Sequence, residues 1–149
     1  MKVVCTNRQA GFKYFLEDKF EAGIVLRGPE VKSLRGGGGN LKDSYARFKG
    51  IELFLFNCHM TPYKYARVEE QDPLRDRKLL MHKRELIRLI GKIKEKGYTL
   101  IPTKIFFNDN GFAKVELALA TPKKKYDKRE DIKKRDTERA LQRAIKKYK

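Results

Sequence analysis

Apolar residues alternate with other residues along several stretches of this chain, and a period of two predicts β-strands. The clearest single strand covers residues 20–28, where every second residue from Phe20 to Leu26 is apolar. Four further stretches form two pairs, each joined across a short turn signal that contains glycine. They predict two β-hairpins, one from residues 41–48 and 51–60, the other from residues 98–107 and 112–120.

Apolar residues at helical spacing predict three helices. Residues 82–97 predict the longest, because Leu86, Leu89, Ile90 and Ile93 share one face and a glycine ends the stretch. Residues 28–35 predict one or two turns between a proline and a glycine run, and residues 7–18 predict a short opening helix. Residues 61–77 are polar and irregular, which predicts a long loop.

These elements predict a mainly β fold with some α-helix. Five main strands of this kind are typical of an OB-like antiparallel β-barrel, whose ends the helices would close. Residues 1–122 are the size of one ordinary domain, and we interpret them as the OB-like barrel. Residues 123–149 follow as a basic C-terminal tail.

The charge of the chain indicates its partner. Residues 123–149 contain 13 Lys and Arg against five Asp and Glu, and they carry +8 of the net charge of +17. The tail offers little apolar area to bury, so we expect it to be disordered when free. Its composition favours helix, so we expect it to become helical against a polyanion. This combination indicates nucleic acid as the partner.

Several classes of protein do not fit the sequence. No apolar run approaches the ~20 residues of a membrane-spanning helix, and the N-terminus does not resemble a signal peptide. Cys5 and Cys58 form no metal or redox motif, so we expect two free thiols in a reducing cytoplasm.

The residues with reactive side chains do not form an enzyme's site. Residues 36–39 are all glycine, but Asn40 rather than Lys follows them, so they predict a flexible turn and no P-loop. His59 and His82 are too few for a zinc site, and Cys58 and His59 should point to opposite faces of a strand. We therefore expect neither catalysis nor a cofactor or metal.

Basic residues interleaved with aromatic ones are the remaining signal, since such groups contact phosphates and stack on bases. Arg8 and Lys42 belong to this set, together with Lys64 and Tyr65. Two alternatives remain open from composition alone. One is a general OB-fold RNA-binding or ribosome-associated protein, and the other is an RNA-processing enzyme that uses one of the two histidines.

Several longer motifs are more specific than composition. EAGIVL, EVKSLR, NLKDSYA, DPLRDRKLLMHKREL, GKIKEKGYTLIP, KVELALA and YDKRED occur in this order. With them the chain closely resembles the tmRNA-binding small protein B family, also called SsrA-binding protein. The resemblance implies an OB-like barrel that is not an enzyme. It also implies binding to the tRNA-like domain of tmRNA, delivery of that RNA to stalled ribosomes for trans-translation, and a tail that contacts ribosomal RNA. Elongation factor Tu would be reached indirectly, through tmRNA.

The resemblance also implies roles for single residues. Together with the basic–aromatic pattern it predicts an RNA-binding set: Asn7, Arg8, Glu21, Lys32, Arg35, Asn40, Lys42 and Leu80. For Leu80, packing in the core is an equally good interpretation. The predicted ribosome-binding residues of the tail are Lys123, Lys124, Lys125, Tyr126, Asp127, Lys128 and Arg129. The family usually has a basic residue where this chain has only glycine at residues 36–39, and backbone N–H groups could replace its phosphate contact.

Overall fold

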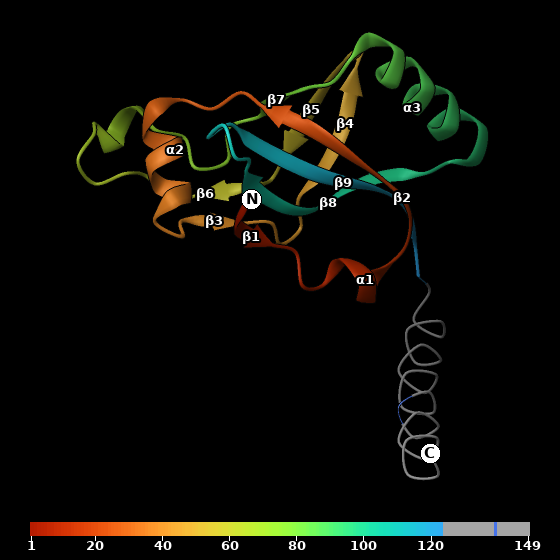
Figure 1. Cartoon of the computed structure of the whole chain (residues 1–149), viewed down its shortest axis with the longest axis horizontal. Coiled ribbons are helices and arrows are strands. Elements are labelled where there is room, and N and C mark those ends of the chain that lie inside the picture. The colour runs from red at the N-terminus through yellow and green to blue at the C-terminus, as the bar shows by residue number, and fades with distance from the viewer. Residues whose placement is uncertain (124–138, 140–149) are drawn as a thin grey trace.

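Most strands of this computed structural model, which describes residues 1–123 and 139, belong to one antiparallel sheet (Figure 1). The sheet follows the order β1-β8-β4-β5-β7-β2-β9. Because β8 also pairs with β9, the strand pairings from β8 through β4, β5, β7, β2 and β9 form a ring. The bounds are β1 Lys2–Thr6, β2 Tyr14–Ile24, β4 Tyr45–Lys49, β5 Glu52–Phe56, β7 Arg77–Leu80, β8 Thr99–Phe107 and β9 Ala113–Pro122. Two short strands, β3 Gly39–Asn40 and β6 His59–Met60, pair with each other.

The alternation of apolar residues builds the core, as the sequence predicts. Leu53 and Leu55 of β5 are fully buried, and so are Val115 and Leu117 of β9. Both predicted hairpins are confirmed, because β4 pairs with β5 and β8 pairs with β9. The mainly β fold is therefore confirmed.

Two of the three predicted helices are confirmed. Helix α3, Lys83–Lys96, packs Leu89 into the core and ends at Gly97, whose φ of 67° is the left-handed conformation that glycine favours. Helix α2 spans Gly28–Arg35 and carries a proline in its first turn. Among the described residues, no helix is long and apolar enough to cross a lipid bilayer.

The predicted helix at residues 7–18 is wrong in extent. Helix α1 covers only Ala10–Lys13, and β2 begins directly after it at Tyr14. The strand pairs with β9 from its first residue, Tyr14 opposite Pro122 and Leu16 opposite Ala120. Pairing along a neighbouring strand satisfies these backbone groups, and this tertiary contact outweighs the helical spacing of the phenylalanines.

The polar stretch after β6 is a loop, as predicted, apart from one 3₁₀ turn, η1, at Val68–Glu70. The strand β7 begins at the end of this loop, and no prediction covered it or β1. β1 and β7 have only five and four residues, and each becomes a strand by pairing with strands distant in the chain, β1 with β8 and β7 with both β5 and β2.

The glycine run after α2 forms a turn at Gly36 and Gly37, as predicted, but it is closely packed at Gly38 and Gly39. A Cβ on Gly38 would collide with Ser33 Oγ and lie 2.9 Å from the Ser33 carbonyl oxygen. A Cβ on Gly39 would lie 2.6 Å from Leu34 Cδ2, which is in the core. Glycine is required here because two chain segments approach too closely for any side chain.

We expect Gly38→Ala to lower the free energy of unfolding by about 1–3 kcal/mol, since the added methyl group must displace backbone atoms. Gly91→Ala is the matched control. Gly91 lies within α3, and a methyl group added there would meet nothing within 4 Å, so alanine should stabilise by about 0.5–1 kcal/mol. Urea unfolding followed by circular dichroism measures both. Equal effects of the same sign would contradict the packing argument.

Candidate RNA-binding site

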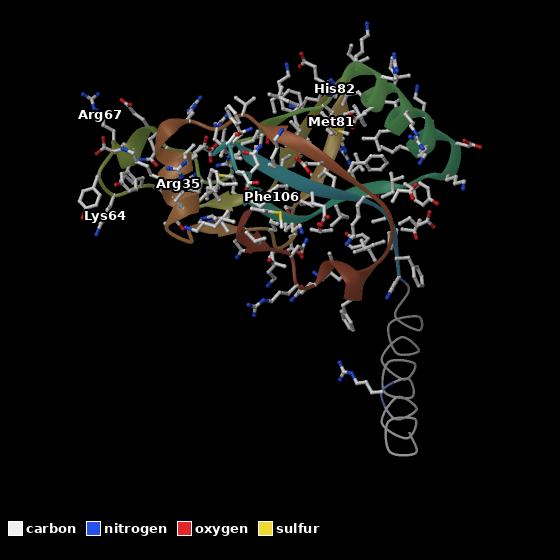
Figure 2. The ribbon with its side chains drawn as sticks, viewed as in Figure 1. Arg35, Lys64, Arg67, Met81, His82 and Phe106 are labelled. Atoms are coloured by element: carbon white, nitrogen blue, oxygen red, sulfur yellow. The ribbon has the colours of Figure 1, made fainter. Side chains whose placement is uncertain are left out.

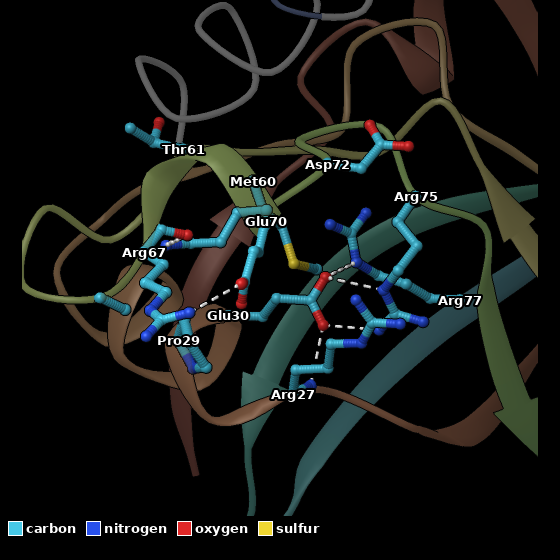
Figure 3. A pocket seen from close by; sticks show the side chains of 12 residues that line it. Arg27, Pro29, Glu30, Met60, Thr61, Arg67, Glu70, Asp72, Arg75 and Arg77 are labelled. Atoms are coloured by element: carbon cyan, nitrogen blue, oxygen red, sulfur yellow. Dashed lines mark hydrogen bonds and ion pairs between the residues drawn. The ribbon is translucent and has the colours of Figure 1, made fainter.

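Helix α2 is held in place by a buried carboxylate (Figure 3). Glu30 accepts hydrogen bonds from Arg77 Nε at 2.6 Å, from Arg75 Nη2 at 2.5 Å and from the Arg27 N–H at 2.8 Å. Burial alone would raise the pKa of Glu30, but these hydrogen bonds and the charge of Arg77 outweigh it and hold the pKa below its usual range. The helix that carries Lys32 and Arg35 is therefore fixed to β7.

Arg77 is fully buried and has other partners besides Glu30. It donates to the Cys58 carbonyl at 2.6 Å and to the Pro73 carbonyl at 3.3 Å, so its guanidinium joins three segments. Burial raises the pKa of the Cys58 thiol to about 12, so the thiol stays protonated at neutral pH. Cys58 is buried and His59 is exposed, so the two side chains point apart as expected, although Cys58 lies between β5 and β6 and not within a strand.

The structure brings Glu21 and Leu80 together. They line one open hollow of about 510 Å³, formed by β2 and β7 with the segment that leads into α3. Gly23 pairs with Leu80 across the two strands, and Leu80 keeps 52% of its surface exposed. The interpretation of Leu80 as a core residue is therefore wrong, and a leucine in this position is available to an RNA base or ribose.

Further residues of this hollow were missed by sequence reasoning. Met81 and His82 lie at its rim next to the start of α3 (Figure 2), and Glu85 and Lys114 also line it. Lys114 belongs to β9, which pairs with β2, and this adjacency depends on the strand order. The alternation of β9 predicts that Lys114 is not in the core, but no sequence signal places it beside Glu21.

Arg8 and Asn40 meet at a second hollow of about 300 Å³, between the end of β1 and β3. Both side chains are exposed. The Asn40 side chain accepts a hydrogen bond from the Lys42 N–H at 2.8 Å, so three predicted RNA-binding residues are neighbours here. Asn7 lies beside them but has a structural role, because its side-chain amide donates to the Pro102 carbonyl at 3.0 Å.

Lys32 and Arg35 both lie over aromatic rings. Lys32 Nζ is 5.4 Å from the centre of the Tyr63 ring, and the Arg35 guanidinium is 5.1 Å from that of Phe107. These cation–π contacts leave both residues exposed on the outer face of α2. The predicted RNA-binding residues thus fall into three groups: Glu21 and Leu80, Arg8 with Asn40 and Lys42, and Lys32 with Arg35.

The glycine run offers few free donors for a phosphate. The N–H of Gly36 donates to the Lys32 carbonyl, that of Gly37 to the Leu34 carbonyl and that of Gly38 to the Ser33 carbonyl. These bonds satisfy the carbonyls at the end of α2. The idea that these backbone N–H groups replace the family's basic residue is therefore wrong for three of the four glycines.

The first residue of the predicted tail belongs to the folded part. Lys123 is 9% exposed, its N–H donates to the Lys13 carbonyl, and its Nζ donates to the Gly11 carbonyl at 3.0 Å. This places Lys123 against α1, so it is not available to a partner as predicted. The remaining predicted tail residues lie outside the described part of the chain: Lys124, Lys125, Tyr126, Asp127, Lys128 and Arg129.

Comparison with known proteins decides the family. The family model described as "SmpB protein" matches residues 4–147. The chain belongs to the SmpB family. The SsrA-binding protein of Geobacter sulfurreducens is 53% identical over 144 residues, covering 97% of this chain and 94% of the relative. That of Thermosipho melanesiensis is 52% identical over 146 residues, covering 98% and 99%.

A solved structure supports the same assignment to the SmpB family. It is described as "tmRNA-SmpB: a journey to the center of the bacterial ribosome", and it matches with a TM-score of 0.68 at 49% sequence identity. The match covers 84% of this chain and 87% of the solved chain. The family resemblance drawn from EVKSLR, NLKDSYA and YDKRED is therefore confirmed.

Proposed function

We propose that this chain binds the tRNA-like domain of tmRNA and delivers it to stalled ribosomes for trans-translation. The observation that carries the proposal is the hollow between β2 and β7, where Leu80 is exposed beside Glu21 on a protein with a net charge of +17. An exposed leucine beside a carboxylate suits a ribose or base edge, and Lys114, which lines the same hollow, suits a phosphate. The names of the relatives supply the RNA's identity.

The two parts of the chain have different roles in this proposal. Residues 1–123 form an OB-like barrel that holds the folded RNA, which the ring of strand pairings supports. The basic tail makes a second contact, with ribosomal RNA, and folds on binding. The chain acts as an adaptor without catalysis of its own, and elongation factor Tu reaches it only through tmRNA. It works in the cytoplasm, where ribosomes translate.

The test is competitive binding at physiological salt among the tRNA-like domain of tmRNA, an elongator tRNA and a generic structured RNA. We expect a preference of about 100-fold or more for the tRNA-like domain, which corresponds to about 3 kcal/mol. Salt must be fixed because a chain this basic binds any RNA in dilute buffer.

Two variants connect this preference to the hollow. Leu80→Asp adds a negative charge at the exposed leucine, and we expect most of the preference to disappear while the fold remains. Ile87→Asp is the matched control, since Ile87 is exposed to a similar degree on α3 and does not line the hollow. Equal binding of all three RNAs by the natural sequence would contradict the proposal and would show that the protein is a non-specific, basic RNA-binding barrel.

A further inference from the structure

The long polar loop between β6 and β7 is held by hydrogen bonds, and the side chain of Gln71 makes three of them. Gln71 accepts a hydrogen bond from the Tyr63 N–H at 2.8 Å. Its amide nitrogen donates to the Tyr63 carbonyl at 3.1 Å and to the Arg67 carbonyl at 3.3 Å. Gln71 therefore fixes the backbone on both sides of Tyr65.

Both ends of the loop are attached to α2 and the glycine run. At the start, the Ser33 hydroxyl donates to the Thr61 carbonyl at 2.6 Å, and the Thr61 N–H donates to the Gly38 carbonyl at 2.8 Å. At the end, Arg75 and Arg77 bind Glu30 (Figure 3). The loop is thus presented in a defined position relative to α2.

What the loop presents is an aromatic ring. Tyr65 is 75% exposed, the highest exposure of any large apolar or aromatic residue in the described part of the chain. Its ring meets that of Tyr63 edge to face with centres 5.4 Å apart, and Lys64 Nζ is 4.8 Å from its centre. Lys32 reaches over Tyr63 from α2. Single exposed aromatic residues are common, but here Gln71 holds the backbone on both sides of the exposed ring.

The charges around the ring favour a polyanion. Lys32 and Lys64 have no carboxylate partner among the described residues, while Arg67 is paired with Glu70 at 3.2 Å. We propose that the loop of residues 61–76 is a preformed platform on which an unpaired base of the bound RNA stacks against Tyr65, with its phosphates near Lys32 and Lys64. Stacking suits any base, since every base has a π-face, and a fixed ring loses little entropy on binding.

The position of the platform indicates which RNA supplies the base. Lys64 and Arg67 lie at the α2 end of the molecule, away from Met81 and His82 at the rim of the Glu21–Leu80 hollow (Figure 2). Lys123, which precedes the rest of the tail, lies against α1, and α1 is far from this loop (Figure 1). Because Arg77 of β7 joins the loop to the strand that carries Leu80, we assign the base to the folded RNA held at that hollow.

This inference rests on the proposed function, and its test uses the full-length chain with the tRNA-like domain of tmRNA at fixed salt. We expect Tyr65→Ala to weaken binding by about 10-fold, in the range found for loss of one base–aromatic stack. Tyr65→Phe keeps the ring and should bind within about twofold of the natural sequence. Because the side chain is exposed, both variants should unfold at the same temperature as the natural sequence.

The dependence of affinity on salt separates stacking from charge. Tyr65→Ala should leave the slope of log affinity against log salt unchanged, whereas Lys64→Gln should reduce its magnitude by about 0.7–0.9. Tyr65→Ala binding as tightly as the natural sequence would overturn the platform, and so would an equal loss in Tyr65→Phe. If the natural sequence itself shows no preference for the tRNA-like domain, the proposed function is wrong. If it shows the preference but Tyr65→Ala keeps it in full, only the platform is wrong.

Discussion

Glu30→Gln is expected to lower the free energy of unfolding by about 3–5 kcal/mol. The substitution keeps the size of the side chain but removes the negative charge that faces Arg77, whose side chain is 0% exposed. Arg75 loses the same partner. Because neither guanidinium gives up its proton at accessible pH, the variant must fold with a buried positive charge that nothing neutralises.

Glu52→Gln provides the matched control. Glu52 pairs with Lys78 at 3.3 Å, but the two side chains are 54% and 44% exposed, so we expect a loss of at most about 1 kcal/mol. Urea unfolding followed by circular dichroism gives both values. A loss below about 1 kcal/mol in Glu30→Gln would show that α2 and β7 do not depend on this carboxylate.

The same pair predicts a dependence on pH. The folded-state pKa of Glu30 lies below its ordinary value, so its charge stabilises the fold above the unfolded-state pKa of about 4.3. That contribution is lost as the pH falls through the lower, folded-state pKa. The difference in stability between the natural sequence and Glu30→Gln should therefore be constant near neutral pH and shrink in acid. A difference that grows below about pH 4 would contradict the lowered pKa.

A chain that ends at Lys123 is expected to keep its affinity for the tRNA-like domain within about 10-fold at physiological salt and to lose ribosome rescue. Lys123 is retained because its side chain and backbone are bound to α1. The hollow that contains Glu21 and Leu80 is complete without the removed residues. The measurements are RNA binding and transfer of a nascent peptide to aminoacylated tmRNA on ribosomes stalled without a stop codon.

A second variant separates the tail's charge from its motif. The full-length chain with Tyr126→Ala and Asp127→Ala keeps every lysine and arginine, so RNA affinity should not fall. Rescue should still drop, because we propose that Tyr126 stacks on a ribosomal RNA base and Asp127 positions a basic neighbour. If the truncated chain instead loses affinity for tmRNA by several orders of magnitude, the division between barrel and tail is wrong.

An element could be predicted from the sequence when the residues that define it lie close together in the chain. The hairpins β4–β5 and β8–β9 were predictable because each strand pairs with its neighbour across a turn that contains glycine. Helix α3 was predictable because its apolar face and Gly97 are local features. β1 and β7 were not, since each is short and is defined by a distant strand.

The candidate site divides in the same way. The sequence alone determined a mainly β fold, a strongly basic surface and, through EVKSLR, NLKDSYA and YDKRED, the family, because these depend on residue type and order along the chain. Only the tertiary structure decided that Leu80 is exposed beside Glu21, that Gly38 and Gly39 are closely packed and that Lys123 is anchored. The positions of Leu80 and Lys123 depend on segments that meet across long separations in the chain. The packing of Gly38 and Gly39 depends on how the chain folds back on the end of α2. Local residue patterns encode neither.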